Sequence, residues 1–377
     1  MKKNYFNIML SAFVTVMLLF ASCEFLSDSD SSTNQNSSEN TDGTTDTDNN
    51  TDTDGNTGGD SSDSDSGSAG GDLNVSDIIT KTSWDSFFPE RWGVGSTWDS
   101  MYGSKYDAVD LYSYDNLSAA IDELSNIQLK VSSTGSAAAS SVITVSRKDT
   151  RISDSWVELY SYGWVDYTYE AIVNFNEFCN KPGASEEDTN REFAAFLANI
   201  SHETGYSDDI GLFYREEVAY EGVGTTAYSD SSSWFVFQPV AGQSYHGRGP
   251  IQLSWNYNYG YAGECIYGDG NTTLLTNPDT VKEDGKLAFM TAIWFWMLPQ
   301  PAKPSCHEVM YSDFTANSNQ RNVWGFGHTA LIINGGLEGN GAMKERRLTF
   351  YKKFAGLLGV SIGENGEVLN TDGLVAY

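Results

Sequence analysis

The sequence predicts a mainly helical (α+β) domain with a small β element, preceded by a segment that does not fold. Several stretches repeat apolar residues at helical spacing, and two short stretches alternate apolar and polar residues. The first fifth of the chain has neither pattern. Of the 377 residues, we therefore assign 73–377 to one folded domain, which is long enough to bury a sizeable core.

The chain begins with a targeting signal. Two lysines precede an apolar run that is too short to span a membrane and ends at Ala21-Ser22, directly before Cys23. Small residues before a cysteine resemble a bacterial lipoprotein box. We expect residues 1–22 to be a lipoprotein-type signal peptide and Cys23 to be acylated, with an ordinary signal peptide as the alternative.

Residues 23–72 predict a lipid-anchored, acidic, disordered tether. After Leu26 the segment is almost entirely Ser, Thr, Asp, Asn and Gly, so it cannot bury enough apolar surface to offset its ordering entropy. The whole chain carries a formal charge of -29, which disfavours nucleic acid as a partner and is compatible with a neutral sugar polymer. We expect an outward-facing monomer held at the cell envelope or cell surface by its lipid, or a secreted one.

Three cysteines remain besides Cys23, and an odd number of widely spaced thiols does not make a disulfide framework. At most one pair could form among Cys179, Cys265 and Cys306, and the sequence leaves the pairing open.

The first predicted elements of the domain are a helix and two strands. Asp115 begins a capped apolar stripe at helical spacing, with aromatic residues Phe87, Phe88 and Trp92 expected to pack beneath it. Alternation over 127–131 and again over 143–145 predicts two short strands or a hairpin.

An aromatic-rich segment follows, and its end, around Tyr169 to Asn176, has helical spacing. Exposed aromatic rings stack on sugar faces, so Trp156, Trp164 or Tyr167 could form subsites, although core packing is the more common role.

The next helix is predicted to carry chemistry. Thr189 to Glu192 reads as a capping box ahead of an apolar face, and Gly205 ends the pattern just after His202-Glu203. Farther along, 285–298 is apolar nearly all round and predicts a buried helix that contains Trp294 and Trp296. An apolar segment over 329–334 ends in a glycine turn, and 343–358 predicts a closing helix.

Two groups of carboxylates are candidates for catalysis. Apolar neighbours would raise the pKa of Glu203 by desolvation, as a general acid requires. A second carboxylate must come from Glu216, Glu217 or Glu221, which follow in one stretch. Because Tyr206 stands where a second histidine would be needed, the zinc motif H-E-x-x-H is absent, and we predict no metal and no cofactor.

A glycine-punctuated loop, YHGRGPIQLSWNYNYG, comes next and interleaves amides and hydroxyls with aromatic rings. Two carboxylates facing each other across such a lining are what sugar hydrolysis requires, because one protonates the leaving oxygen and the other activates water or attacks.

From about Thr82 to Val360, with one long insertion near 125–160, the sequence resembles the family 19 glycoside hydrolases, the lysozyme-like chitinases of plants and bacteria. The resemblance rests on HET, the glutamate of GLFYREE, the loop above, AIWFWMLPQPAKPSCH and LIINGGLEGNG. It implies a two-lobed helical domain with a substrate groove. The insertion could rim that groove or be a plain surface excursion.

The resemblance also implies roles for single residues. It makes Glu203 the proton donor, Glu217 the general base with Glu216 pointing elsewhere, and Ser254 the hydroxyl that holds the attacking water. It places further residues in the groove or beside the carboxylates, where an arginine would keep the base ionised: Gln252, Tyr257, Asn258, Lys303, Asn334, Glu338 and Arg347. For Lys303 and Glu338, a solvated surface charge is the alternative.

These implications predict an endo-acting, inverting hydrolase of β-1,4-linked N-acetylglucosamine polymers, that is, a chitinase. One alternative changes the polymer to peptidoglycan, as for a muramidase. Another is a sugar-binding surface lipoprotein that has lost catalysis, which the retained Glu203, Glu217 and Ser254 disfavour.

Overall fold

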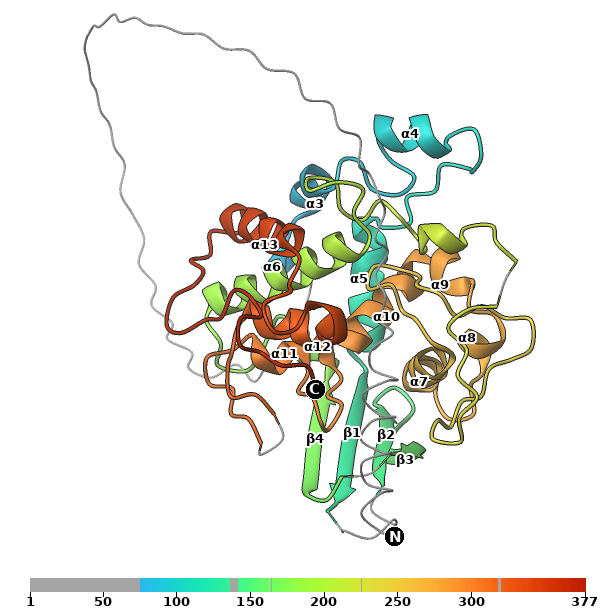
Figure 1. Cartoon of the computed structure of the whole chain (residues 1–377), viewed down its shortest axis with the longest axis vertical. Helices are drawn as coiled ribbons and strands as arrows, with labels where there is room; N and C mark the ends of the chain where they lie inside the picture. The colour runs from blue at the N-terminus through green and yellow to red at the C-terminus, as the bar shows by residue number, and fades with distance from the viewer. Residues whose placement is uncertain (1–74, 136–141, 164, 225, 318–319) are drawn as a thin grey trace, which may run out of the picture. The chain divides into compact units, whose positions relative to one another are not determined.

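The computed structural model describes residues 75–135, 142–163, 165–224, 226–317 and 320–377. It is mainly helical with one small antiparallel sheet, which confirms the predicted fold class (Figure 1). The predicted signal peptide, Cys23, the tether and Trp164 lie outside the described residues. Within the described ranges, no helix has the length and apolarity needed to cross a membrane.

The first helices pack aromatic residues into the core. They are α2 (Val75–Ile78), α3 (Lys81–Phe87), α4 (Ser96–Tyr102) and α5 (Tyr114–Leu124). The apolar stripe of α5 is buried, and Phe87, Phe88 and Trp92 are buried as predicted. The N-cap of α5 is Ser113 and not Asp115 as predicted. The Ser113 side chain accepts a hydrogen bond from the backbone amide of Asn116, and Asp115 lies in the first turn.

The sheet contains β1 (Ile127–Thr134), β2 (Ile143–Asp149), β3 (Ser153–Tyr162) and β4 (Thr168–Asn174), in the order β3-β2-β1-β4. All neighbouring strands are antiparallel, so the predicted hairpin is confirmed as β1 and β2. The helix indicated by the spacing around Tyr169 to Asn176 is wrong, because strand β4 occupies most of that stretch. The same residues also alternate, and adjacent β-branched Ile172 and Val173 favour a strand.

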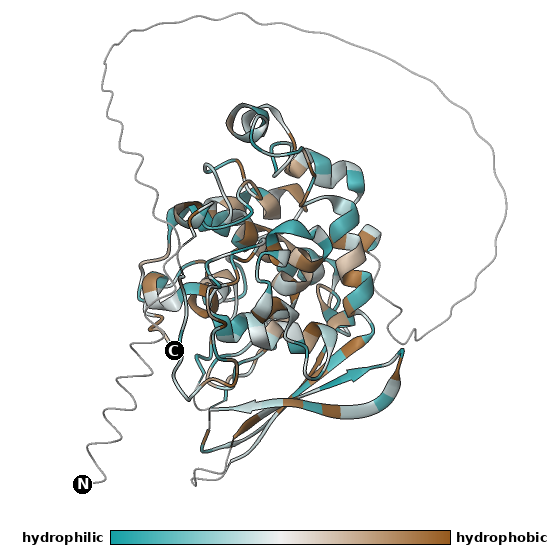
Figure 2. Cartoon of the chain, turned by 90° about the vertical axis from the view of Figure 1, so that its right-hand side faces the viewer, coloured by the Kyte–Doolittle hydropathy of each residue, from teal (hydrophilic) through white to brown (hydrophobic). Residues whose placement is uncertain are grey.

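One face of this sheet belongs to the core of the domain. Ile127, Leu129 and Val131 of β1 are completely buried, whereas the residues between them are half-buried. Figure 2 shows the strands running beside the helices, with hydrophobic and hydrophilic positions interspersed. The insertion is therefore packed onto the domain through its inner face.

Helix α6 (Glu186–Glu203) begins earlier than predicted. Its N-cap is Ser185, which forms a capping box with Asp188. The capping box predicted at Thr189 to Glu192 is wrong, because the Glu192 carboxylate is buried and accepts hydrogen bonds from the Trp296 indole at 2.9 Å and the His307 ring at 2.8 Å.

This correction predicts different costs for two similar substitutions. Replacing Ser185 with Ala should lower the free energy of unfolding by about 1 kcal/mol, because an N-cap hydrogen bond is lost. Replacing Thr189 with Ala, inside α6, should change it by less than about 0.5 kcal/mol. Denaturant unfolding of both variants measures the difference, and equal costs would contradict the assignment of the cap.

The remaining helices lie in the second half of the chain. They are α7 (Asn256–Tyr267), α8 (Thr273–Thr276), α9 (Thr280–Glu283), α10 (Gly285–Met297), α11 (Cys306–Val309), α12 (Phe326–Glu338) and α13 (Glu345–Leu357), with short 3-10 turns at Phe175–Glu177 and Val218–Tyr220. Helix α10 is buried, including Trp294 and Trp296, as predicted. Helix α13 packs along α6 (Figure 1). Cys179, Cys265 and Cys306 are buried and free.

Candidate active site

Glu203 is the last residue of α6, and its side chain is 7% exposed. The apolar positions of α6 bury one side of the helix and carry Glu203 into the interior, where Arg347 of α13 donates a hydrogen bond to its Oε1 at 2.7 Å. Burial raises the pKa of Glu203, and the charge of Arg347 offsets part of that rise. The carboxyl group is thus biased toward its protonated form.

Arg347 connects Glu203 to a second buried carboxylate. Its guanidinium donates to both oxygens of Glu338, at 2.6 and 3.1 Å, and to the Asn199 side-chain oxygen at 2.7 Å. The Asn334 amide also donates to Glu338, at 3.1 Å. Burial alone would raise the pKa of Glu338, but the charge and hydrogen bonds of Arg347 outweigh it and lower the pKa to about 2.

This arrangement corrects the electrostatic prediction. Arg347 was expected to keep the base ionised, but it contacts Glu203 and Glu338 and makes no ion pair with Glu217 in the described residues. Glu338 supplies the negative charge that balances Arg347. The pKa of Glu203 can therefore remain raised although a cation touches it.

His202, Glu203 and Glu338 bring possible metal-ligand atoms within 4.8 Å of one another. The guanidinium of Arg347 already bonds both carboxylates. A metal ion would have to displace this fixed cation, so the residues present fit a salt-bridged cluster better than a metal site.

Glu217 lies on a segment anchored to the end of α6. The amides of Leu212 and Tyr214 donate to the side chain and carbonyl of Thr204, both at 2.9 Å. On its other side, the segment pairs with the glycine-rich loop, because the amide of Glu217 donates to the Gly247 carbonyl at 2.8 Å. The segment that carries Glu217 thus joins the residue after Glu203 to the loop.

The Glu217 side chain is itself buried and held by two donors. The Tyr228 hydroxyl donates to Oε1 at 3.0 Å and the Gly247 amide to Oε2 at 3.4 Å. Burial raises the pKa of Glu217, and these two hydrogen bonds oppose the rise. No lysine, arginine or histidine forms an ion pair with this carboxylate in the portion of the chain described.

The neighbouring Glu216 points elsewhere, as predicted. Lys282 and His246 contact its Oε2 at 2.9 and 3.0 Å. Burial would raise the pKa of Glu216, but these partners lower it to about 2. Glu216 is therefore a structural carboxylate held by basic partners, whereas Glu217 carries no such ion pair.

The loop residues are ordered by bonds within the loop. The Ser254 hydroxyl donates to the Gln252 carbonyl at 2.9 Å, and the Asn258 amide donates to the Ser254 carbonyl at 2.9 Å. The Gln252 amide donates to the Gly249 carbonyl at 2.9 Å. Tyr257 is buried and stacks on Phe235, with ring centroids 3.9 Å apart. These bonds fix the loop that the sequence singled out.

The alternative that Lys303 and Glu338 are solvated surface charges is wrong, because both are buried. Lys303 donates to the carbonyl of Ile332 at 3.3 Å, and burial lowers its pKa to about 8. Asn334, two residues farther along, interrupts α12 with a non-helical φ of -140°. This kink turns the end of the helix and places Asn334 beside Glu338.

The structure thus brings Glu203, Asn334 and Arg347 into one hydrogen-bonded cluster, and it links Glu217 to the loop of Gln252, Ser254 and Asn258 through backbone pairing. Sequence patterns gave no signal for several partners, because their contacts join positions 11 to 148 residues apart and follow no local spacing. These missed partners are Asn199, Tyr228, His246 and Lys282.

Comparison with known proteins gives a consistent set of relatives. Residues 160–368 match the family model described as chitinase class I. Chitinase 1 of Oryza sativa subsp. japonica is 43% identical over 222 residues, which cover 54% of this chain and 66% of that protein. Endochitinase A2 of Pisum sativum is 39% identical over 223 residues, covering 53% and 63%. The chain thus spans just under two thirds of the length of these relatives.

Solved structures of related proteins also align with the chain. A bacterial family 19 chitinase aligns with 26% identity and a TM-score of 0.48, covering 77% of this chain and all of that one. Chitinase C from Streptomyces griseus aligns with the same identity and TM-score, covering 77% of this chain and 97% of that one.

Proposed function

Because the chain belongs to the class I chitinases, the family 19 glycoside hydrolases, we propose that it is an endo-acting chitinase that cleaves β-1,4-linked N-acetylglucosamine polymers with inversion. The observation that carries this proposal is the pair of buried carboxyl groups with raised pKa, Glu203 and Glu217, on two segments joined through Thr204.

In the proposed reaction, Glu203 donates its proton to the glycosidic oxygen as the bond from that oxygen to the anomeric carbon breaks. Glu217 takes a proton from a water molecule that attacks the same carbon from the opposite face. Inversion requires the two carboxyl groups to be about 6.5–9.5 Å apart, so that this water fits. Two different segments can satisfy that spacing, whereas Glu216 and Glu217 as neighbours cannot.

The other side chains of the site bind and orient the substrate. We assign Ser254 to hold the attacking water, and Gln252, Tyr257, Asn258, Lys303 and Asn334 to bind the sugar chain. Arg347 keeps Glu203 in place and is itself balanced by Glu338. The proposed reaction uses no cofactor.

The substrate and the stereochemistry can be tested together. Chitin hexamer and purified peptidoglycan sacculi are incubated separately with the protein, and the first products are analysed by NMR. We expect hexamer cleavage with the α-anomer released first. Cleavage of sacculi alone would replace chitin with peptidoglycan as the substrate, a β-anomer would contradict inversion, and binding without cleavage of either polymer would indicate a sugar-binding protein.

We also propose that the catalytic domain, residues 73–377, is a monomer tethered through residues 23–72 to a lipid on Cys23 after removal of residues 1–22. The sequence before Cys23 supports this proposal. Mass spectrometry of the N-terminal peptide from cells would detect the acyl chains, and an unmodified N-terminus elsewhere would contradict the anchor.

A further inference from the structure

We propose that the outer face of the four-stranded sheet is an accessory binding surface for an amino-sugar polysaccharide chain, separate from the catalytic carboxylates. The choice of ligand rests on the proposed function. The family match begins at residue 160, so β1, β2 and most of β3 precede it. Catalysis as proposed above uses none of these residues.

The sheet is a rigid platform with one face packed and the other open. On the packed side, the Tyr160 ring lies 4.5 Å from the Tyr261 ring, and Arg147 donates to the Cys265 carbonyl at 3.1 Å. The strand register then puts the alternate side chains of all four strands on the opposite, outer face. A fixed backbone lowers the entropy that would be lost on binding.

The outer face has an aromatic ring that comes from its edge strand β3. Trp156 of β3 is half-buried, and the ammonium groups of Lys130 and Lys148 lie 5.3 and 5.2 Å from its ring centroid. Neither lysine forms an ion pair with any described residue. Indole rings stack on the apolar faces of sugars, and the two ammonium groups can donate hydrogen bonds to hydroxyl and acetamide oxygens.

Polar side chains extend from this ring along the register of the sheet. One row across the strands contains Glu170, Ser132, Thr144 and Ser161, and the next contains Ile172, Lys130, Ser146 and Glu158. Three members of the first row, Glu170, Ser132 and Thr144, line a cavity of about 340 Å³ at the end of the sheet, which is within the size range of small-ligand sites. Ser146 is buried, and the Thr144 and Ser161 hydroxyls bond each other at 2.9 Å. The Ser132 hydroxyl, the two carboxylates and the ammonium groups still offer the donors and acceptors that a neutral, hydroxyl-rich ligand needs.

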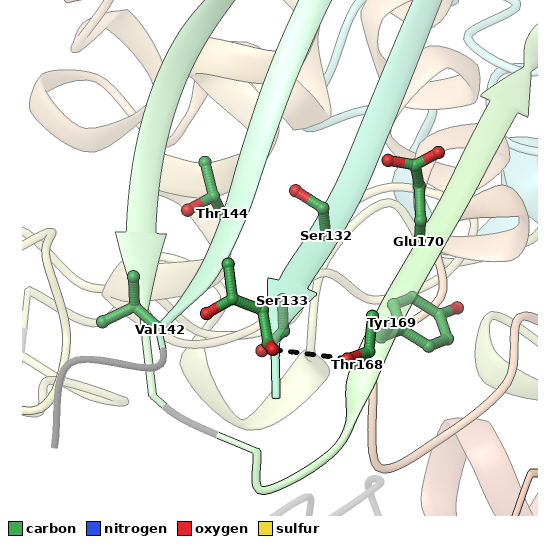
Figure 3. Close-up of a pocket in the computed structure, with 8 residues that line it drawn as sticks. Ser132, Ser133, Val142, Thr144, Thr168, Tyr169 and Glu170 are labelled. Atoms are coloured by element: carbon green, nitrogen blue, oxygen red, sulfur yellow. Dashed lines mark hydrogen bonds between the residues drawn. The ribbon is translucent and has the colours of Figure 1, made fainter. Parts of the chain in front are cut away.

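Figure 3 shows Ser132, Thr144 and Glu170 projecting from adjacent strands at this cavity, with the Thr168 hydroxyl bonded to the neighbouring strand. Glu170 is exposed and has no basic partner within ion-pair distance among the described residues. An apolar partner would leave these groups unsatisfied. The two glutamates of the rows balance Lys130 and Lys148, so these residues give the face no net positive charge to attract nucleic acid. A neutral sugar chain fits this combination best.

The sheet is also tied to a segment of the proposed groove. The Tyr167 hydroxyl, one residue before β4, donates to the carbonyl of Pro301, two residues from Lys303. A polymer held on the sheet would therefore keep the catalytic domain close to its substrate. The expected benefit is adsorption to insoluble polymer, with little effect on soluble oligomers.

The test compares adsorption to insoluble chitin with hydrolysis of soluble chitin hexamer. Trp156→Ala should weaken adsorption by about fivefold, the effect of losing one stacking contact, and leave hexamer kcat/KM unchanged. Glu170→Ala should also weaken adsorption without disturbing the fold, since its side chain is exposed. Ile152→Ala, at the exposed turn between β2 and β3, is the matched control and should adsorb as the unaltered protein does.

Trp156→Phe keeps an aromatic ring and should restore most of the adsorption. If the two single variants, Trp156→Ala and Glu170→Ala, both adsorbed as the unaltered protein does, the proposal would be overturned. So would a loss of adsorption in Ile152→Ala equal to that in Trp156→Ala. If the unaltered protein adsorbs through Trp156 but does not cleave hexamer, then the proposed function fails and the accessory surface stands.

Discussion

Replacing Glu203 with Gln should lower the hydrolysis of chitin hexamer by a factor of about 10³, because general-acid catalysis is typically worth about 10²–10⁴. Gln is nearly isosteric and its carbonyl oxygen can still accept the hydrogen bond from Arg347, so the fold and substrate binding should persist. Steady-state kinetics with hexamer, together with binding of hexamer by calorimetry, measure both effects.

The control for this variant is Glu264→Gln. Burial also raises the pKa of Glu264, but that residue lies in α7 and makes no contact with the Arg347 cluster. The Glu264→Gln variant should therefore hydrolyse hexamer at the rate of the unaltered protein. Turnover by Glu203→Gln at more than about a tenth of the unaltered rate would show that another group supplies the proton.

The pH dependence follows from the same two carboxyl groups. The base must be ionised and the acid protonated, so activity should rise as pH increases through the pKa of Glu217 and fall above the pKa of Glu203. Burial raises both pKa values from that of an ordinary glutamate. The active range should therefore lie above the usual glutamate pKa, and the upper limb should disappear if Glu203 is not the acid.

The core of the fold could be predicted from periodicity, but the ends of its helices could not. Both S-E-E-D at Ser185 and T-N-R-E at Thr189 fit a capping box, and only burial of Glu192 among Trp296, His307 and Tyr311 excludes the second. Similarly, β4 satisfied a helical and a strand pattern at once. When a short pattern fits two structures, contacts with residues distant in sequence select between them, and a local pattern does not reveal those contacts.

Motifs identified single residues of the site, but not their pairing. Glu203 and Arg347 are joined across 144 positions, and no local pattern indicates which of two carboxylates an arginine will contact. The resulting error placed the cation beside the base. In the structure, Arg347 instead donates hydrogen bonds to Glu203 and Glu338. The proposed base, Glu217, accepts hydrogen bonds from the Tyr228 hydroxyl and a backbone amide.

The last consequence of this geometry separates the adjacent glutamates. Replacing Glu217 with Gln should lower kcat for hexamer by a factor of about 10² or more, because the attacking water loses its proton acceptor. Since Glu217 has no ion-pair partner in the described structure, the free energy of unfolding should change by less than about 1 kcal/mol. Kinetics and denaturant unfolding on the same preparation measure the two quantities.

Glu216→Gln should give the reverse pattern. Its carboxylate bonds Lys282 in the interior. The substitution leaves that ammonium group with only the more exposed Asp279, at 3.3 Å, and should cost about 2 kcal/mol, the value of a hydrogen bond between charged groups. Because the pKa of Glu216 is lowered to about 2, its contribution to stability is present above the unfolded-state pKa and is lost as pH falls toward 2. The stability difference between the Glu216→Gln variant and the unaltered protein should therefore shrink in acid. If Glu216→Gln instead lost activity while Glu217→Gln kept it, the base would be Glu216, and the salt bridge to Lys282 would have to open during the reaction.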